Sequence, residues 1–380
     1  MIELSTFQSG HLEKGNGYHY FIPNEVNTQW IWKDPTLNTL LEKASVKLGE
    51  LNSYARFVPN VNLFIQLHVT KEAVISSKIE GTQTKIDEAL LPEGEVNPER
   101  RQDWKEVNNY ISALNDAISE LKELPLSSRL IRKAHKTLME GVRGEYKLPG
   151  EYRTSQNWIG GANLADAAFI PPHHQLVNPL MGDLENFIHN ENIEVPELIC
   201  IGIAHYQFET IHPFLDGNGR IGRLLITLFL VGKGILDQPL LYLSAYFEKN
   251  KQLYYGSLTN VRSKNDLLEW LKYFLIGIIE TATQGVETLT EILELKERIE
   301  TEIKSTYGRR TQSALLLLQS LLVNPITTAE RAAKNCDLSY KAANGLIAAM
   351  QKSGYLKEMT GQSRNRIFSF DLYLQSFSLE

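Results

Sequence analysis

The sequence predicts a mainly α-helical protein that contains a small β-hairpin and ends in a winged helix-turn-helix. Apolar residues recur at helical spacing over most of the chain. This spacing is lost between residues 141 and 172, where Gly, Asn and Pro become frequent, and short apolar pieces there predict the hairpin. Residues 311–380 carry three short helical patterns followed by two strand-like pieces, which is the element order of a winged helix.

The composition is that of an ordinary soluble globular protein. The chain has 380 residues, a length typical of two or three domains, and its net charge of −6 disfavours a general binder of polyanions. The two cysteines, Cys200 and Cys336, lie far apart, so neither a disulfide framework nor a zinc site is indicated. We find no signal-peptide pattern and no apolar run near the ~20 residues of a membrane span, and we therefore expect a cytoplasmic protein without membrane contact.

The N-terminal region, residues 1–100, is expected to be helical after an irregular segment at residues 1–35. Helical spacing predicts the first four helices over residues 40–51, 63–80, 107–122 and 128–139. Gly81 suits the C-terminal cap of the second helix. Residues 90–101 are rich in Pro, Gly and Glu, which predicts a loop.

The rest of the chain is divided into three parts. Residues 101–285 form the predicted core domain, whose later helices are expected over residues 176–189, 196–209, 253–261 and 267–281. Residues 286–310 contain a charged stretch with helical period, which we interpret as a linking helix. The winged helix at residues 311–380 is predicted to have helices over 313–323, 328–335 and 339–352 and strands over 355–359 and 367–370.

One segment carries most of the chemical information. Residues 212–223 read His-Pro-Phe-Leu-Asp-Gly-Asn-Gly-Arg-Ile-Gly-Arg. His212 could take a proton from a hydroxyl nucleophile, and Asp216 could hold Mg²⁺. Arg220 and Arg223 offer planar forks of N–H donors for phosphate or carboxylate. Each of these groups suits one step of nucleotidyl transfer.

The glycines of this segment and the residues after it favour anion binding. Gly217, Asn218 and Gly219 let the backbone approach phosphate oxygens with its N–H groups pointing inward. The apolar run at residues 224–230 predicts a buried helix, so the loop lies at a helix N-terminus. The glycine spacing also matches the dinucleotide-binding fingerprint, but that fingerprint must follow a buried strand, and residues 203–212 are polar and helix-like.

The segment resembles the signature of the Fic family of protein adenylyltransferases, H-x-F-x-[D/E]-G-N-G-R-x-x-R, and meets every fixed position of it. The sequence Gly-Glu-Tyr-Arg at residues 150–153 resembles the G-x-[FY]-R motif of the family. Phe169, Ile170 and Pro171 resemble part of the family's β-hairpin flap, which aligns a target segment. Tyr254 and Tyr255 resemble its adenine-side tyrosine pair, with Tyr254 as the wall of the adenine pocket.

The resemblance implies a Fic-type helical catalytic core and transfer of AMP from MgATP to a Ser, Thr or Tyr hydroxyl of a target protein, or of the chain itself. His212 would be the general base, Asp216 would hold Mg²⁺, and Arg223 would grip the γ-phosphate. The residues implied to contact ATP are Glu80, Asp216, Gly217, Asn218, Gly219, Arg220, Ile221, Gly222, Arg223, Tyr254 and Tyr255.

Residues 76–81 read Ser-Ser-Lys-Ile-Glu-Gly and fit the inhibitory pattern [S/T]-x-x-x-E-[G/N] of the family's self-inhibited subclass. The resemblance assigns Ser76, Glu80 and Gly81 to an inhibitory helix end. We expect Glu80 to form a bidentate pair with Arg223, in the place of the γ-phosphate, and Ser76 to tie the helix to the signature loop. The unmodified protein is then expected to be largely self-inhibited.

Two other functions stay open. One is a de-adenylylating hydrolase in which Glu80 positions a water molecule. The other is a transcriptional regulator whose core senses nucleotide, but the winged helix carries few cations, so DNA is the less favoured partner. The cations in question are Lys341, Lys352, Arg364 and Arg366. A homodimer is left open.

Overall fold

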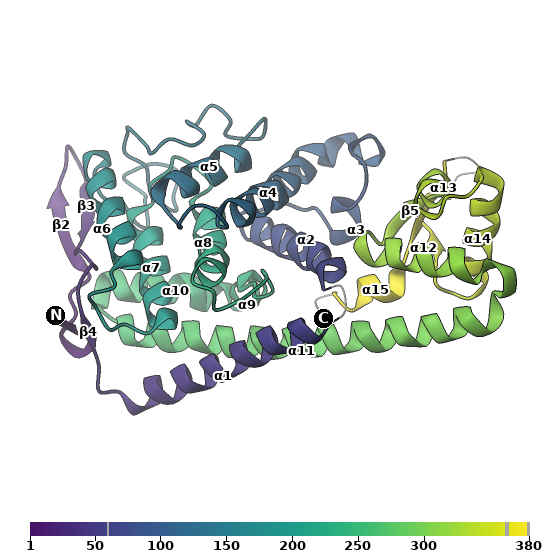
Figure 1. Ribbon diagram of the computed structural model, residues 1–380. Coiled ribbons are helices and arrows are strands. Elements are labelled where there is room, and N and C mark those ends of the chain that lie inside the picture. The colour runs from purple at the N-terminus through teal and green to yellow at the C-terminus, as the bar shows by residue number, and fades with distance from the viewer. Residues whose placement is uncertain (59–60, 362–364, 378–380) are drawn as a thin grey trace.

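The computed structural model describes residues 1–58, 61–361 and 365–377. Helices make up most of this part, and the strands are short, which confirms the mainly α-helical class (Figure 1). Most of the predicted helices are present, with ends that differ by a few residues. Arg364, one of the cations considered for DNA binding, lies outside the described residues.

The N-terminal arm contains four strands, so the prediction of an irregular segment there was wrong. β1 (Ile2–Glu3) pairs in parallel with β4 (Trp30–Ile31), and β2 (Gly10–Lys14) pairs antiparallel with β3 (His19–Pro23). Between β2 and β3 the chain reads Gly-Asn-Gly at residues 15–17, a turn composition typical of hairpins. The two strands are only five residues long and β2 is exposed, so neither shows the alternation of a half-buried strand.

Two long helices run side by side along one face of the molecule (Figure 1). α1 (Pro35–Phe57) begins at Asp34, whose side chain accepts a hydrogen bond from the Leu37 N–H at 2.7 Å. α11 (Leu267–Thr306) has 40 residues, which corresponds to about 60 Å at 1.5 Å per residue. The sequence predicted two helices here, one over residues 267–281 and one within residues 286–310, but α11 continues through Gly285. Its missing side chain allows close packing against Leu51 of α1.

The centre of the catalytic core is formed by α7 (Glu197–Ile211) and α8 (Asn218–Gly232), whose residues are almost all buried. A helix that is apolar on all sides is typical of such a central position. α4 (Arg101–Glu120) and α5 (Ser128–Leu138) pack against α8, and α6 (Val177–His189) and α11 pack against α7. α9 (Ser244–Lys249) and α10 (Lys251–Lys264) reach α7 through the rings of Phe247 and Tyr254, which contact His205. The signature segment is the turn between α7 and α8, so the buried centre of the core carries it.

α2 (Asn62–Ile79) is shared by two parts of the molecule. It packs against α4, α8 and α9 of the core and also against α12 (Thr311–Val323) of the C-terminal domain. The His68 ring of α2 meets the Phe377 ring edge-on, with 4.8 Å between the ring centres. The C-terminal end of α2 carries the predicted inhibitory residues.

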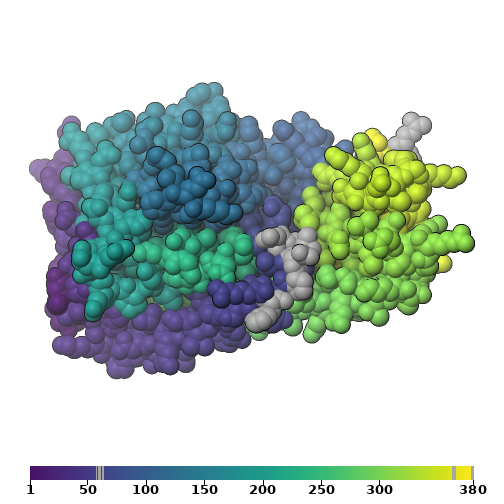
Figure 2. Space-filling model, in the orientation of Figure 1, coloured from purple at the N-terminus to yellow at the C-terminus, as the bar shows by residue number. Residues whose placement is uncertain are grey.

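The C-terminal domain is a separate lobe beside the core (Figure 2). After α12 it contains β5 (Ile326–Thr328), α13 (Ala329–Cys336), α14 (Tyr340–Lys352), β6 (Lys357–Glu358), β7 (Ile367–Ser369) and α15 (Asp371–Gln375). The three strands form an antiparallel sheet in the order β5-β7-β6. The three predicted helices and two predicted strands are present, β5 was not predicted, and the winged-helix interpretation stays a prediction.

The remaining elements are short. They are α3 (Ile86–Ala89) and the 3-10 helices η1 (Leu4–Thr6), η2 (Glu93–Glu95), η3 (Pro98–Arg100), η4 (His174–Leu176) and η5 (Gly308–Arg310). Between α5 and η4 the expected hairpin is reduced to a single antiparallel bridge, Ile159 with Phe169. None of the described helices combines the length and the apolar composition that a membrane-spanning segment requires.

Buried histidines make the fold sensitive to acid. Burial lowers the pKa of His68 and His205 to about 3 and that of His135 to about 4. Between pH ~6.5 and ~4 the unfolded chain therefore binds protons at these residues and the folded chain does not. Folding stability from these groups is complete above pH ~6.5 and is lost as the pH falls, by about 1.4 kcal/mol per pH unit for each group inside this window.

We expect urea unfolding at pH 7, 6 and 5 to give a decreasing free energy of unfolding. His68 Nε2 has no hydrogen-bond partner within the described chain, so His68→Leu removes one titrating group without breaking a hydrogen bond of that nitrogen. The pH dependence of the variant should be shallower than that of the wild type. Equal slopes for the two proteins would contradict the assignment of this effect to His68.

Candidate active site

The turn between α7 and α8 is held in one conformation by its own residues. His212 ends α7 in the left-handed region, with φ 50° and ψ 62°, and Gly217 precedes α8 with φ 75°. The side-chain amide of Asn218 closes the turn, because its oxygen accepts from the Phe214 N–H and its nitrogen donates to the Phe214 carbonyl, both at 2.8 Å. The N–H groups of the first turn of α8 have no partners within their own helix, so they are available to an anion.

His135 of α5 packs against this turn and hydrogen-bonds to it, a role that the sequence did not indicate. Its ring stacks on Phe214 with 3.8 Å between the ring centres. Its Nδ1 accepts from the Gly150 N–H at 2.9 Å, so its Nε2 carries the proton and donates to the Asp216 carbonyl at 3.0 Å. Its lowered pKa keeps it neutral in this arrangement.

His212 lies at the wall of a large cavity, and its buried Nδ1 has no hydrogen-bond partner within the described chain. Burial, followed by the charges of Arg262 and Arg153, lowers its pKa to about 3. The imidazole is therefore neutral near pH 7 and able to accept a proton. Its carbonyl accepts from Arg153 Nε at 3.0 Å, and Arg153 Nη2 also donates to the Pro172 carbonyl at 2.5 Å, which joins the turn to the end of the flap.

Asp216 is ionised at neutral pH. Burial alone would raise its pKa, but the hydrogen bond and charge of Lys147, followed by the charge of Arg220, outweigh burial and lower it. Asp216 Oδ2 lies 2.9 Å from Lys147 Nζ, and Oδ1 accepts from the Gly217 N–H at 2.7 Å. The carboxylate side chain is about one-third exposed.

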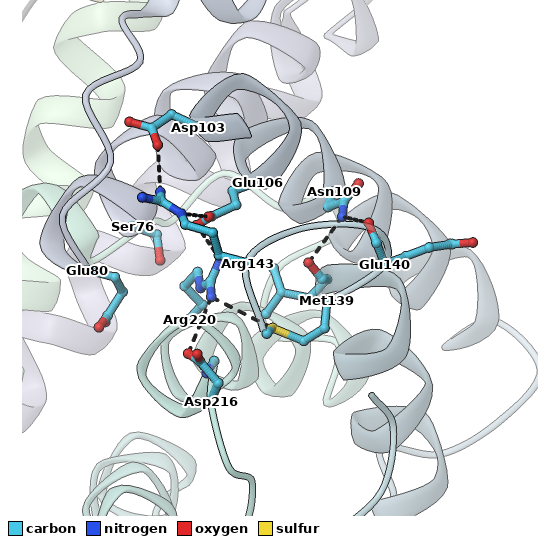
Figure 3. A network of polar contacts seen from close by, with 12 residues as sticks. Ser76, Glu80, Asp103, Glu106, Asn109, Met139, Glu140, Arg143, Asp216 and Arg220 are labelled. Atoms are coloured by element: carbon cyan, nitrogen blue, oxygen red, sulfur yellow. Dashed lines mark hydrogen bonds and ion pairs between the residues drawn. The ribbon is translucent and has the colours of Figure 1, made fainter. Parts of the chain in front are cut away.

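Arg220 points away from the cavity, into a chain of charges that connects α8 to α4 (Figure 3). Its Nη1 lies 3.2 Å from Glu106 Oε2, and Glu106 Oε1 accepts from Arg143 Nε at 2.7 Å. Arg143 Nη2 in turn donates to Asp103 at 2.5 Å. Glu106 and Arg143 were not identified from the sequence. The guanidinium of Arg220 thus holds α8 in place, and only its backbone remains near the expected phosphate position.

Arg223 connects α8 to the end of α2, as the inhibitory pattern predicted. Its Nη2 donates to Glu80 Oε1 at 2.7 Å and to the Ser76 carbonyl at 2.8 Å, and its Nε donates to Ser76 Oγ at 2.9 Å. The pair with Glu80 uses one carboxylate oxygen, so the expected bidentate geometry was wrong. Burial lowers the pKa of Arg223, but the charges of Glu80, Tyr254 and Tyr255, together with the hydrogen bond to Glu80, outweigh burial and raise it.

Two glycines allow this close approach. A Cβ at Gly219 would lie 2.4 Å from Glu80 Oε1, and Gly81 has a φ of 107° at the point where α2 ends. A Cβ at Gly222 would lie 2.2 Å from Glu209 Oε1. Glu209 was missed in the sequence analysis: it is buried, its Oε1 lacks a partner within the described chain, and burial raises its pKa to about 7.

The cavity has a volume of about 1030 Å³ and collects residues from five segments. Of the residues expected to form the site, eight line it: Glu80, Phe169, Ile170, His212, Gly219, Arg223, Tyr254 and Tyr255. The others do not line it, and the side chain of Ile221 is completely buried in the core. The N-terminal hairpin β2–β3 also lines the cavity, which the sequence analysis did not anticipate.

Tyr254 is a fixed part of the wall. Its ring stacks on Phe247 with 4.3 Å between the ring centres, and its hydroxyl lies 2.9 Å from His205 Nε2. His205 Nδ1 lies 2.9 Å from the Gly222 carbonyl, which can only accept, so Nδ1 donates and Nε2 accepts from Tyr254. Tyr255, the next residue, is 41% exposed and borders the same cavity.

Two family profiles match this chain. The Fic/DOC family N-terminal profile matches residues 38–119, and the Fic/DOC family profile matches residues 125–230, which includes the turn between α7 and α8. The chain belongs to the Fic/DOC family. The N-terminal profile covers Ser76 and Glu80, and both profiles end before Tyr254 and Tyr255.

Curated relatives and a solved structure agree with this Fic assignment. The chain is 31% identical over 175 residues to a probable protein adenylyltransferase of Aquifex aeolicus, covering 46% of this chain and 51% of that protein. It is 27% identical over 173 residues to the protein adenylyltransferase fic-1 of Caenorhabditis elegans, covering 41% and 31%. The chain thus spans about half or less of the length of these relatives. A Fic family protein from Desulfovibrio desulfuricans has the same fold, with a TM-score of 0.56, 19% identity and coverage of 89% and 96%.

The Fic turn itself yields a stability prediction. Asn218→Ala would leave the buried N–H of Phe214 unpaired, while the Phe214 carbonyl would keep its hydrogen bond from Asn157 Nδ2 at 2.9 Å, so we expect a loss of about 1–3 kcal/mol in the free energy of unfolding. Asn218→Asp keeps the acceptor for the N–H but buries a carboxylate beside the Phe214 carbonyl oxygen, so its loss should be at least as large. Urea unfolding of the three proteins at pH 7 measures both losses. An alanine variant as stable as wild type would show that the amide does not close the turn.

Proposed function

We propose that the protein is an adenylyltransferase that moves AMP from ATP to a Ser, Thr or Tyr hydroxyl of a target protein, with the chain itself as one target. The proposal rests on one observation: a neutral His212, the first turn of α8 and Arg223 all border the same cavity. The names of the curated relatives support the same activity.

In the proposed reaction the target hydroxyl oxygen attacks the α-phosphorus of ATP. A new P–O bond forms, the bond to the oxygen that bridges to the β-phosphate breaks, and pyrophosphate leaves with that electron pair. His212 takes the hydroxyl proton, and its αL backbone, fixed by Arg153, holds the ring at the cavity wall. Backbone N–H groups at Gly219 and its neighbours in α8 bind the phosphate oxygens.

Mg²⁺ suits the donor set at Asp216, so we propose this carboxylate as its protein ligand. Mg²⁺ is usually held by one or two carboxylates, phosphate oxygens and water. Within the described residues no group of three or more His, Cys, Asp or Glu could hold a metal, so the other ligands would come from ATP and water. When bound there, Mg²⁺ would offset charge on the α- and β-phosphates.

The role of the C-terminal domain is a further part of the proposal. We favour a protein-contact role for its winged-helix-like arrangement over DNA binding, because the described part of α14 and of the strands with their flanks offers few cations, namely Lys341, Lys352, Lys357 and Arg366. The domain boundaries at residues 100, 285 and 310 and the cytoplasmic location belong to the same proposal. Cys200 and Cys336 are free and buried, which fits a reducing compartment.

His212 can be tested in a background that is released from inhibition. We expect Glu80→Gly to incorporate AMP from MgATP, and we expect His212→Ala in that background to lower the rate by about 10²–10⁴-fold, which is the usual contribution of a positioned general base. Mass spectrometry of the intact protein gives the rate as the gain of one AMP. ATP binding, measured by calorimetry, should be nearly unchanged. Transfer within a few-fold of the parent would remove His212 from the role of base.

Glu80 is expected to inhibit the wild type. Its carboxylate occupies the Arg223 fork that would hold the γ-phosphate, so ATP is kept from the pose that in-line attack needs. We expect Glu80→Gly and Glu80→Gln to incorporate more radiolabelled AMP than wild type. Ser76→Ala is the matched control, because it removes one hydrogen bond to Arg223 and leaves the carboxylate in place.

Melting temperatures establish that each variant is folded. If folded Glu80 variants incorporate no more AMP than wild type, Glu80 is an ordinary helix-end residue. The same proteins distinguish transfer of AMP from its removal. Removal is the alternative function, and the observation that favours it is the position of Glu80 in the same cavity as His212. A hydrolase would release AMP from a modified target with wild type and not with Glu80→Gln.

A further inference from the structure

The cavity is larger than a nucleotide alone requires. Its volume of about 1030 Å³ lies at the upper end of single small-molecule sites, which hold about 300–1,000 Å³. Its lining separates into two ends. The nucleotide end is formed by Glu80, Gly219, Arg223, Tyr254 and Tyr255. The other end, called here the hairpin end, is formed by β2, β3, the flap and the last turn of α10.

The two ends differ in charge. Two carboxyl groups line the cavity. Glu80 pairs with Arg223 at the nucleotide end, and the buried Glu209 lies between the two ends, where its charge acts on both Arg223 and Arg262. The ionisable side chains at the hairpin end are His11, His19 and Arg262, and no Asp or Glu of the described residues lines it. The hairpin end is therefore a concave surface whose charged and titratable groups are nitrogen bases.

Arg262 is the fixed cation of this end. Its Nε donates to Thr210 Oγ1 at 3.1 Å and its Nη2 to the Glu209 carbonyl at 3.0 Å. Within the described chain Nη1 has no hydrogen-bond partner and no carboxylate lies within ion-pair distance of the guanidinium. Burial lowers the pKa of Arg262 by more than the charges of Tyr206, Glu209 and Tyr254 raise it. An anion entering this end would supply the missing counter-charge.

The walls around Arg262 are held in place by contacts between distant segments. Its guanidinium carbon lies 4.1 Å from the centre of the Phe169 ring on the flap. The Ser9 hydroxyl donates to the Arg262 carbonyl at 3.1 Å, and the Phe21 N–H of β3 donates to the Ile170 carbonyl at 2.9 Å. These hydrogen bonds connect the N-terminal hairpin to the flap and the segment before it to α10.

We propose that the hairpin end binds the target segment and selects one that carries an Asp or Glu side chain close to the modified hydroxyl. Arg262 pairs with that carboxylate through its free Nη1, while His212 in the same cavity receives the hydroxyl. The proposal rests on the proposed adenylyltransferase function and names its substrate class, a hydroxyl residue in an acidic sequence.

The test uses the full chain with Glu80→Gly and short peptides with a central Ser, Thr or Tyr. The peptides are identical except for one flanking position, which is Glu, Gln or Lys, placed in turn one or two residues on either side. The readout within each protein is the ratio of kcat/KM for AMP incorporation between the Glu and Gln peptides. Charge-assisted pairing predicts a ratio of about 10 to 100 in the parent, with the Lys peptide slower still.

Substitutions at Arg262 should change this ratio in a defined order. Arg262→Lys keeps the charge and should keep most of the preference, Arg262→Gln should bring the ratio close to 1, and Arg262→Glu should favour the Lys peptide. Lys264→Gln is the matched control, because Lys264 is an exposed cation on the same helix outside the cavity lining, and it should keep the parental ratio. Melting temperatures verify folding.

Binding is measured separately from transfer. Fluorescence anisotropy of the labelled Glu and Gln peptides, with the same set of variants, tests the selection even if no AMP is transferred. Failure of transfer to every peptide and to the chain itself, with Glu-selective binding retained, would contradict the proposed function and leave the acidic selection supported. Equal binding of the two peptides overturns the selection. A rise in the KM for ATP with Arg262→Gln, equal for all peptides, also overturns it, because Arg262 would then serve the nucleotide.

Discussion

The arrangement of the site depends on how the buried charge of Arg223 is satisfied. A buried guanidinium without acceptors would cost several kcal/mol, so the end of α2 must lie where Ser76 and Glu80 can reach it. That requirement fixes the position of a helix 143 residues away in the sequence from Arg223. It also makes Gly219 necessary, because any side chain there would meet the Glu80 carboxylate.

The parts of the site that lie in one continuous segment could be predicted from the sequence. The turn between α7 and α8 combines His212, Asp216 and Gly217 with apolar helices on both sides, and this local pattern determines both its shape and its helix N-terminus. The contact between Glu80 and Arg223 was predicted through the family resemblance of each residue, since no periodicity connects them. Its single-oxygen geometry could not be predicted, because it depends on where α2 ends relative to α8.

The supporting residues could not be predicted, because their roles arise only when distant helices meet. Glu106 in α4 is one of many charged helix residues until Arg220 turns toward it, and His135 has no special neighbours in sequence. The N-terminal hairpin is a different case. The Gly-Asn-Gly turn at residues 15–17 was a readable signal, but short exposed strands gave it no apolar alternation. Arg262 and Glu209, like Glu106, could not be predicted from the sequence, because their significance comes from the cavity that they share.

The shared position of α2 has a consequence for how the protein unfolds. One end of this helix is covered by α12 and by Phe377, and the other end supplies the acceptors of Arg223. α2 is buried on most of its circumference, so its stability depends on packing against both of these neighbours. The core and the C-terminal lobe therefore form one cooperative unit, and removing residues after Thr306 would expose apolar surface on the same helix that shapes the nucleotide end of the cavity.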